Sequence, residues 1–156
     1  MSENSETAQV LIRPPFAWAV AVIAGLALDW LEPVPVLPED WPNGLLGAVV
    51  FVLALALAIW AMDTMTRAGT NVPTNRPTTA MVESGPYRFT RNPIYLGMFG
   101  GLVGLAIAFD SPWLLAMLVP FALVIRYGVV AREEAYLERK FDQAYRDYRK
   151  RVRRWL

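Results

Sequence analysis

The sequence predicts an all-α fold, a polytopic membrane helical bundle of about four transmembrane helices with a cytoplasmic loop and an amphipathic C-terminal helix. Three observations support it. Hydrophobic residues make up 55% of the 156 positions, they gather into four long blocks, and the basic residues concentrate in alternate connections between those blocks. Because about 20 apolar residues cross a bilayer core, such blocks are typical of membrane spans.

The four apolar blocks are Phe16–Leu31, Leu45–Met62, Ile94–Phe109 and Trp113–Val130. The second contains no charged residue, while the first and third are short for a full span. We interpret the first block as a retained helix rather than a cleaved signal peptide. Its leading region carries Glu3 and Glu6 against Arg13, and no small-x-small cleavage site follows.

The charges of the connections predict the orientation. The connection between the first two blocks carries Glu32, Glu39 and Asp40 and no basic residue, and a short turn, Asp110-Ser111-Pro112, joins the last two. The connection after the second block carries four arginines, and nine of the 15 basic residues follow position 131. Positive charge marks the cytoplasmic side, so both termini are expected in the cytoplasm of a prokaryotic cell, around an inner-membrane bundle.

We expect one integral membrane domain over residues 1–156. It divides into an N-terminal helix pair (1–63), a cytoplasmic loop (64–92), a helical hairpin (93–131) and an amphipathic tail helix (132–156). Prolines at positions 73, 77 and 86 make the loop irregular, because proline lacks an N–H donor and restricts the residue before it. Long loops of this kind are either solvated linkers or functional segments.

The tail has a helical stripe of apolar residues at three- and four-residue spacing: Leu137, Phe141, Tyr145, Tyr148, Val152 and Trp155. Such a basic amphipathic helix suits either an anionic leaflet or packing against the loop. Extending the stripe backwards by seven residues from Phe141 reaches Glu134. Because an unpaired buried carboxylate is costly, we predict a cationic or donor partner for Glu134.

The composition limits the chemistry. The chain has no Cys and no His, which excludes disulfides, thiolate nucleophiles, zinc fingers and imidazole bases. We predict neither a metal site nor a nucleic-acid partner; membrane lipids are the expected surroundings. Acid–base work falls to Asp, Glu, Tyr, Lys or Arg.

Asn92 and Pro93 predict the start of the third helix, since Asn favours the N-cap and Pro the first helical position. The free N–H groups of that helix end attract a carboxylate. Tyr87 and Tyr95 fit either an aromatic belt at the membrane surface or ring faces against a sulfonium or ammonium cation. The glycines at 97, 100, 101 and 104 are typical of close helix packing, although Gly97 is also compatible with close approach of a ligand.

Arg126 lies within the fourth block, where a charge marks either a functional site or a side chain that reaches back to the headgroups. Glu133 follows Arg126 by seven residues, which predicts one shared face if the helix continues. Glu133 and Glu134 then form a carboxylate pair at the inner surface.

Together these residues resemble the isoprenylcysteine carboxyl methyltransferase and phospholipid methyltransferase superfamily. The resemblance covers about residues 79–152. It rests on the following motifs: Gly85-Pro86-Tyr87, Arg91-Asn92-Pro93-Ile94-Tyr95-Leu96-Gly97, Glu133-Glu134, and Leu137, Phe141, Tyr145 and Tyr148. The frequent His of that superfamily is Asn92 here, which cannot titrate, so a base role at this position is excluded.

The resemblance implies an integral membrane enzyme that uses S-adenosylmethionine on the cytoplasmic side, with a lipophilic acceptor entering from the bilayer. It implies cofactor contacts for Thr79, Ala80, Met81, Val82, Tyr87, Asn92, Pro93, Ile94, Tyr95 and Glu133. For catalysis we expect Arg91 and Arg126 to orient an anionic acceptor or headgroup.

An amine acceptor must lose a proton, and Glu134 or a tyrosine would then serve as base. A carboxylate or thiolate acceptor needs no base. Prenylated cysteine, a phospholipid amine, a small thiol and an isoprenoid carboxylate all stay open as acceptors, because each fits an apolar path that ends at a cytoplasmic methyl donor. A non-catalytic membrane scaffold is the main alternative function. A transporter fits less well, because the spans contain almost no polar residue besides Arg126.

Overall fold

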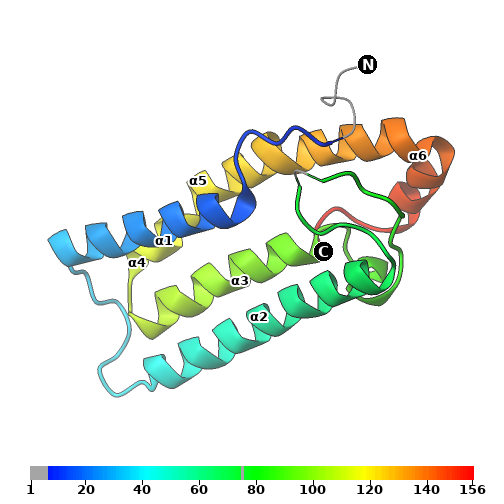
Figure 1. Cartoon of the computed structure of the whole chain (residues 1–156). Helices are drawn as coiled ribbons and strands as arrows, with labels where there is room; N and C mark the ends of the chain where they lie inside the picture. Colours follow the sequence, from blue (N-terminus) through cyan, green and yellow to red (C-terminus); the bar gives the residue numbers. More distant parts are fainter. Residues whose placement is uncertain (1–6, 75) are drawn as a thin grey trace.

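The chain folds into a bundle of roughly parallel and antiparallel helices, with its loops gathered at the two ends (Figure 1). The computed structural model describes residues 7–74 and 76–156, and all regular elements within them are helical. They are α1 (Pro14–Leu31), α2 (Asn43–Arg67), the short 3-10 helix η2 (Gly85–Arg88), α3 (Pro93–Ala108), α4 (Pro112–Ala116), α5 (Leu118–Leu123), the π-helix η3 (Val124–Val130) and α6 (Ala131–Arg151). The all-α prediction is confirmed.

Each predicted apolar block is helical. Three helices are long and apolar enough to cross a membrane, Pro14–Leu31, Asn43–Arg67 and the continuous stretch Pro112–Arg151, and the shorter Pro93–Ala108 is also apolar. The apolar part of the last stretch ends near Val130, and α6 beyond it is rich in charge. We therefore place the spanning part of this stretch at residues 112–130 and treat α6 as lying outside the membrane core.

Prolines mark where the helices begin. Pro14, Pro93 and Pro112 each occupy the first helical position of α1, α3 and α4, where the missing N–H costs nothing and the fixed φ suits the helix. In the turn before α4, Asp110 has a positive φ of 50° and the Ser111 hydroxyl accepts a hydrogen bond from the N–H of Leu114. The predicted tight turn at 110–112 is confirmed.

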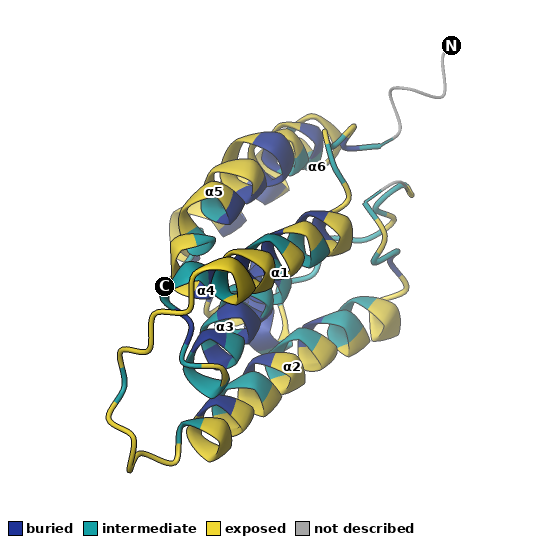
Figure 2. Ribbon diagram, turned by 90° about the vertical axis from the view of Figure 1, so that its left-hand side faces the viewer, coloured by how far each residue is buried: buried dark blue, intermediate teal, exposed yellow. Residues whose placement is uncertain are grey.

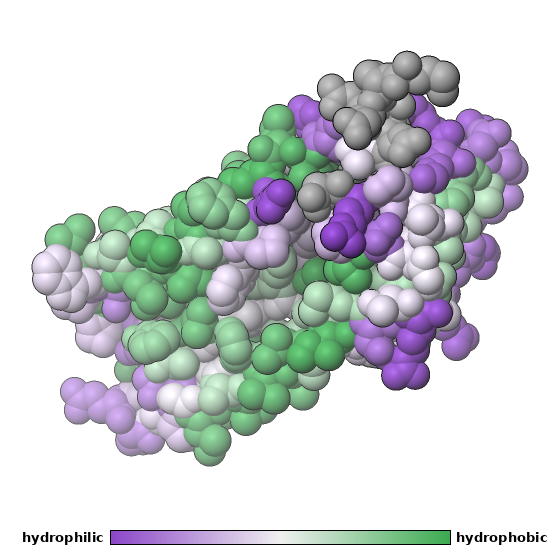
Figure 3. Space-filling view, in the orientation of Figure 1, coloured by the Kyte–Doolittle hydropathy of each residue, from purple (hydrophilic) through white to green (hydrophobic). Residues whose placement is uncertain are grey.

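The outer faces of the helices are apolar, as a bilayer requires. Large hydrophobic side chains on α1 and α2 are exposed, among them Phe16, Ile23, Leu45, Leu53 and Trp60 (Figure 2). Hydrophobic residues cover the middle of the face drawn in Figure 3, and hydrophilic residues collect at its right-hand end. That end carries the 68–92 loop and α6, and we call it the basic end.

Helices α2 and α3 form the closest contact in the bundle, and glycines make it possible. A Cβ added at Gly104 would lie 2.7 Å from the backbone N of Phe51 and 2.9 Å from the carbonyl oxygen of Gly47. A Cβ at Gly97 would lie 2.8 Å from the carbonyl oxygen of Ala54. Close packing on α2 is therefore confirmed for the glycines at 97, 100 and 104, whereas Gly101 faces the rings of Trp18 and Phe51 at ordinary contact distance.

The tail departs from a single straight helix. Asp142 has φ 43°, outside the helical region, and Val152 is extended. The second half of α6 therefore folds back, so that the last residues of the sequence return to the start of α3 (Figure 1). The apolar stripe is buried in this fold: Tyr145, Tyr148 and Val152 form a cluster with Met81 of the loop. Of the two predicted roles for the stripe, packing against the loop is the observed one.

The glycine contact generates a stability prediction. Gly104→Ala will lower the midpoint of thermal unfolding in detergent, because the added methyl group overpacks the α2–α3 contact at a cost of about 1–3 kcal/mol. Gly44→Ala is the matched control, since a Cβ there meets nothing within 4 Å. Equal midpoints for the two variants would contradict the close-packing account.

Candidate functional site

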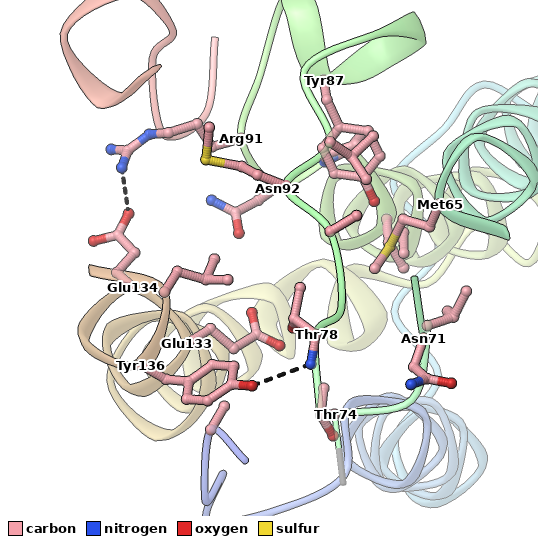
Figure 4. A pocket seen from close by; sticks show the side chains of 18 of the residues that line it. Met65, Asn71, Thr74, Thr78, Tyr87, Arg91, Asn92, Glu133, Glu134 and Tyr136 are labelled. Carbon is pink, nitrogen blue, oxygen red and sulfur yellow. Dashed lines mark hydrogen bonds and ion pairs between the residues drawn. The ribbon is translucent and has the colours of Figure 1, made fainter. Parts of the chain in front are cut away.

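At the basic end, the 71–82 stretch of the loop, the start of α3 and both halves of α6 enclose a cavity of about 140 Å³. Figure 4 shows its walls: Met65 and Asn71 on one side, Arg91 and Glu134 on the other, and Glu133 directed toward the space between them. The lining includes every predicted site residue except Thr79 and Arg126: Ala80, Met81, Val82, Tyr87, Arg91, Asn92, Pro93, Ile94, Tyr95, Glu133 and Glu134. Residues from distant parts of the sequence thus line one cavity, in keeping with the single site that the resemblance implies.

Thr79 faces away from this cavity. Its hydroxyl donates to the carbonyl oxygen of Gly69 at 2.7 Å, and its N–H donates to the hydroxyl of Thr70 at 2.9 Å. The Thr79 side chain therefore fastens the base of the loop.

Arg126 lies in η3, is exposed, and has its guanidinium carbon 5.4 Å from the centre of the Tyr127 ring. Unlike Glu133, it does not line the cavity. The expected shared face assumed a continuous α-helix, whereas the π-helix η3 has more residues per turn, so a seven-residue spacing does not carry across it unchanged.

Asn92 corrects a detail of the sequence interpretation. It precedes Pro93 at the N-cap position, but its side chain makes no capping hydrogen bond. Instead its Nδ2 donates to the carbonyl oxygen of Arg154 at 2.9 Å. The helix still begins at Pro93, as predicted, and Ile94 and Tyr95, in its first turn, line the cavity.

Among the residues that the structure describes, one hydrogen bond holds Glu133. The Tyr95 hydroxyl donates to its Oε1 at 2.7 Å. Burial raises the pKa of Glu133 to about 7; the hydrogen bond from Tyr95 opposes that rise and the neighbouring Glu134 adds to it. Near neutral pH this carboxyl group therefore exchanges between its charged and neutral forms, and its second oxygen is open to a ligand in the cavity.

Glu134 is held by two arginines. Nη1 of Arg91 lies 3.0 Å from its Oε1, while Arg154 donates from Nε to Oε1 at 2.9 Å and from Nη2 to Oε2 at 2.7 Å. The Glu134 side chain is only 11% exposed. The predicted cationic partner of this carboxylate is thus confirmed, although Arg154 itself was not anticipated.

Tyrosines form much of the remaining wall. The Tyr148 hydroxyl donates to the carbonyl oxygen of Tyr87 at 2.8 Å. Burial raises the pKa of Tyr87 and of Tyr148 well above the ordinary phenol value; at Tyr87 the charge of Glu133 adds to the effect. Both phenols are neutral at physiological pH, so neither is a base in the resting site. Tyr87 is buried in the cavity wall, which favours the site interpretation of this residue over a role in an exposed aromatic belt.

The motifs missed several lining residues. Tyr136 accepts a hydrogen bond from the N–H of Thr78 at 3.1 Å, which ties α6 to the loop (Figure 4). Asn71, Thr74 and Arg76 also line the cavity. Tyr136 could have been predicted from its spacing, because it follows Glu133 by three residues and therefore lies on the same side of α6.

A second recess of about 710 Å³ adjoins the first. The two share Val72, Pro73, Thr74, Ile94 and Tyr95. The rest of its lining comes from the start of α1, from Met62 of α2 and from Met98 of α3, and Arg13 contributes a charge. We call it the α1–α2 groove; its volume falls within the roughly 300–1,000 Å³ range of ligand sites.

Comparison with known proteins identifies the family. A family model described as phospholipid methyltransferase matches residues 43–144, more than half of the chain and most of the residues that build the cavity. The chain belongs to the phospholipid methyltransferase family. With several apolar helices of membrane-spanning character, it is an integral membrane protein.

Two curated relatives match shorter stretches. A protein of Haemophilus influenzae, described as uncharacterized, is 58% identical over 36 residues, which are 23% of this chain and 57% of that protein. The nickel-cobalt-cadmium resistance protein NccN of Alcaligenes xylosoxydans xylosoxydans is 35% identical over 77 residues, 49% of this chain and 36% of that protein. The match covers less than two thirds of either relative.

The double ion pair predicts which glutamate matters for stability. Glu134→Ala leaves two arginines facing each other without an anion, and we expect a loss of about 3 kcal/mol, near the lower end for a broken buried pair. Glu138→Ala is the control, because Glu138 also contacts two arginines, Arg146 and Arg149, but at the surface, where such pairs contribute about 1 kcal/mol or less. Comparable unfolding midpoints for the two variants would refute this account.

Proposed function

We propose that this phospholipid methyltransferase family member is an S-adenosylmethionine-dependent membrane methyltransferase that acts on a lipophilic acceptor at the cytoplasmic face of the membrane. The supporting observation is the pairing of a carboxylate-bearing cavity, lined by tyrosines, with an apolar groove that shares its wall. The cavity suits a cationic donor and the groove suits a lipid chain. The orientation follows from the basic end, because positive charge stays in the cytoplasm.

The cofactor fits the residues present. Glu133 is a carboxylate with one hydrogen-bond partner, suited to the ammonium group of an amino-acid end. The first N–H groups of α3 and their partial positive charge suit the carboxylate of that end. Tyr87 and Tyr95 offer aromatic rings for a sulfonium. Ala80, Met81 and Val82 supply apolar surface for the remainder.

S-adenosylmethionine supplies an activated methyl group, so the task of the protein is alignment and exclusion of water. Holding two reactants in line contributes roughly 7–11 kcal/mol, and a dry site prevents hydrolysis. The chain provides for both through a loop tied to α6 by Tyr136 and closed by the tyrosine cluster of α6.

Both oxygens of Glu134 are occupied by guanidinium groups, which suits a positioning role rather than proton transfer. Glu133 pairs with the ammonium group of the cofactor in this proposal, so we do not assign it as the base for an amine acceptor. Arg91, at the cavity wall, is the candidate to orient an anionic group of the acceptor or cofactor. Arg126, exposed beside Tyr127, suits contact with lipid headgroups.

The pKa of Glu133 generates a binding prediction. Isothermal calorimetry in detergent with S-adenosylhomocysteine, which keeps the amino-acid end, will show binding that strengthens as the pH rises through about 7. The charged carboxylate attracts the ammonium group, and below pH 7 Glu133 is increasingly protonated. Glu133→Gln will bind weakly at every pH and lose the inflection. A wild-type protein that does not bind the ligand would overturn the proposed function and favour a non-catalytic scaffold.

The groove generates a separate prediction about the acceptor. With labelled methyl donor and a panel of prenylated cysteine, thiol and phospholipid amine acceptors, Met62→Trp will slow methyl transfer, because the larger ring fills the α1–α2 groove. Its affinity for S-adenosylhomocysteine will stay unchanged, since Met62 does not line the cavity. Ile59→Trp, on the exposed side of α2, is the control. Equal rates for both variants would exclude the groove as the acceptor path.

A further inference from the structure

Residues 152–156, which we call the strap, cross the start of α3 and bind it through the backbone. The N–H of Arg91 donates to the carbonyl oxygen of Arg153 at 2.9 Å, and Thr90 and Arg153 form an isolated parallel bridge. The carbonyl oxygen of Arg154 accepts from the Thr90 hydroxyl at 3.2 Å and from Asn92 at 2.9 Å. The strap therefore holds the three residues that precede α3.

The strap also reaches α6 through one side chain. The Arg154 guanidinium makes a two-pronged contact with Glu134, using both carboxylate oxygens. This geometry fixes the plane of the carboxylate as well as its position. Two segments, the first turn of α6 and the residues before α3, are thus joined through the Arg154 backbone and side chain together.

Arg91 depends on this contact. Its side chain is 9% exposed and lines the cavity. Nη1 contacts Glu134 at 3.0 Å and the Tyr145 hydroxyl at 3.3 Å. Its Nε is buried without a hydrogen-bond partner among the described residues. With one nitrogen unpaired, the guanidinium is oriented chiefly by Glu134, and Glu134 is oriented by Arg154.

The bend in α6 is what brings the strap to this place. Asp142 has a positive φ, and Arg146, just beyond this bend, pairs with Glu138 at 3.2 Å and with Asp142 at 2.7 Å. The folded-back half then carries Tyr145 and Tyr148 into the cavity wall. Trp155 of the strap rests against Phe99 of α3, with ring centres 5.8 Å apart.

We propose that Arg154 is a positioning residue of the cofactor site: by clamping Glu134 it sets the orientation of Arg91, and it thereby sets the affinity for the amino-acid end of the methyl donor. This inference rests on the proposed function and adds to it. Arg154 itself does not line the cavity. Its effect passes through two side chains that do.

The test compares Arg154→Gln, Arg154→Lys and Arg153→Gln. Arg153 is the matched control, because it is adjacent, carries the same charge, and has an exposed side chain without a hydrogen bond or ion pair among the described residues. S-adenosylhomocysteine affinity is measured by calorimetry at a temperature well below every unfolding midpoint. The midpoint without ligand is measured in parallel.

We expect Arg154→Gln to weaken binding about tenfold, the change that 1.4 kcal/mol produces. Arg154→Lys will recover part of the affinity, because lysine keeps the charge but not the two-pronged contact. Arg153→Gln will bind as the wild type does. Methyl-transfer efficiency will follow the same order. KM for the methyl donor will rise, whereas kcat will stay unchanged.

Three outcomes would overturn the proposal. Equal affinity of Arg154→Gln and Arg153→Gln excludes positioning while leaving the proposed function intact. A lowered unfolding midpoint with unchanged affinity assigns Arg154 a structural role alone. Failure of the wild-type protein itself to bind the ligand removes the proposed function and this inference with it. If Arg154→Gln does not fold, the affinities of Arg154→Lys and Arg153→Lys for S-adenosylhomocysteine are compared instead, and equal affinities would again overturn the proposal.

Discussion

The buried carboxylate of Glu134 is the constraint on which the architecture of the basic end depends. A charged group that is 11% exposed needs cationic partners, and α6 supplies none of them at this site. They come instead from Arg91, before α3, and from Arg154, beyond the end of α6. The contacts of one carboxylate therefore join the residues before α3, the start of α6 and the strap. The cavity lies in the space that these three converging segments enclose.

The membrane helices set where that convergence occurs. Glycines let the α2 and α3 backbones approach closely, which fixes α3 against α2. On the other side of the hairpin, η3 inserts a π segment just before α6. Without the added rotation, the glutamate pair would leave the helix on a different face. The packing and the helical pitch of the membrane-spanning helices therefore determine which side chains of α6 face the loop.

Much of this was predictable from the sequence, and the limits have physical causes. Apolar blocks and helix-starting prolines such as Pro93 are local signals, so the spans and the turn at 110–112 were predicted. The need of Glu134 for a cation followed from its place on the tail's stripe. Its partner Arg154 did not follow, because the bend at Asp142 has no strong local signature and the helical pattern of the tail continues across it. Spacing rules assume 3.6 residues per turn, so they could not predict the π-helical segment around Arg126 either.

Adjacent glutamates in this chain have opposite environments, and that contrast explains why the pair is more than a repeated charge. Glu134 faces two guanidinium groups, which fix its position in the wall. Glu133, one residue earlier and about 100° around the helix, faces one phenol and the cavity, and its pKa rises to about 7. Such different surroundings suit neighbouring carboxyl groups to different roles. Glu133 can interact with a ligand because two arginines hold Glu134 in place. A site of this kind does not require a histidine.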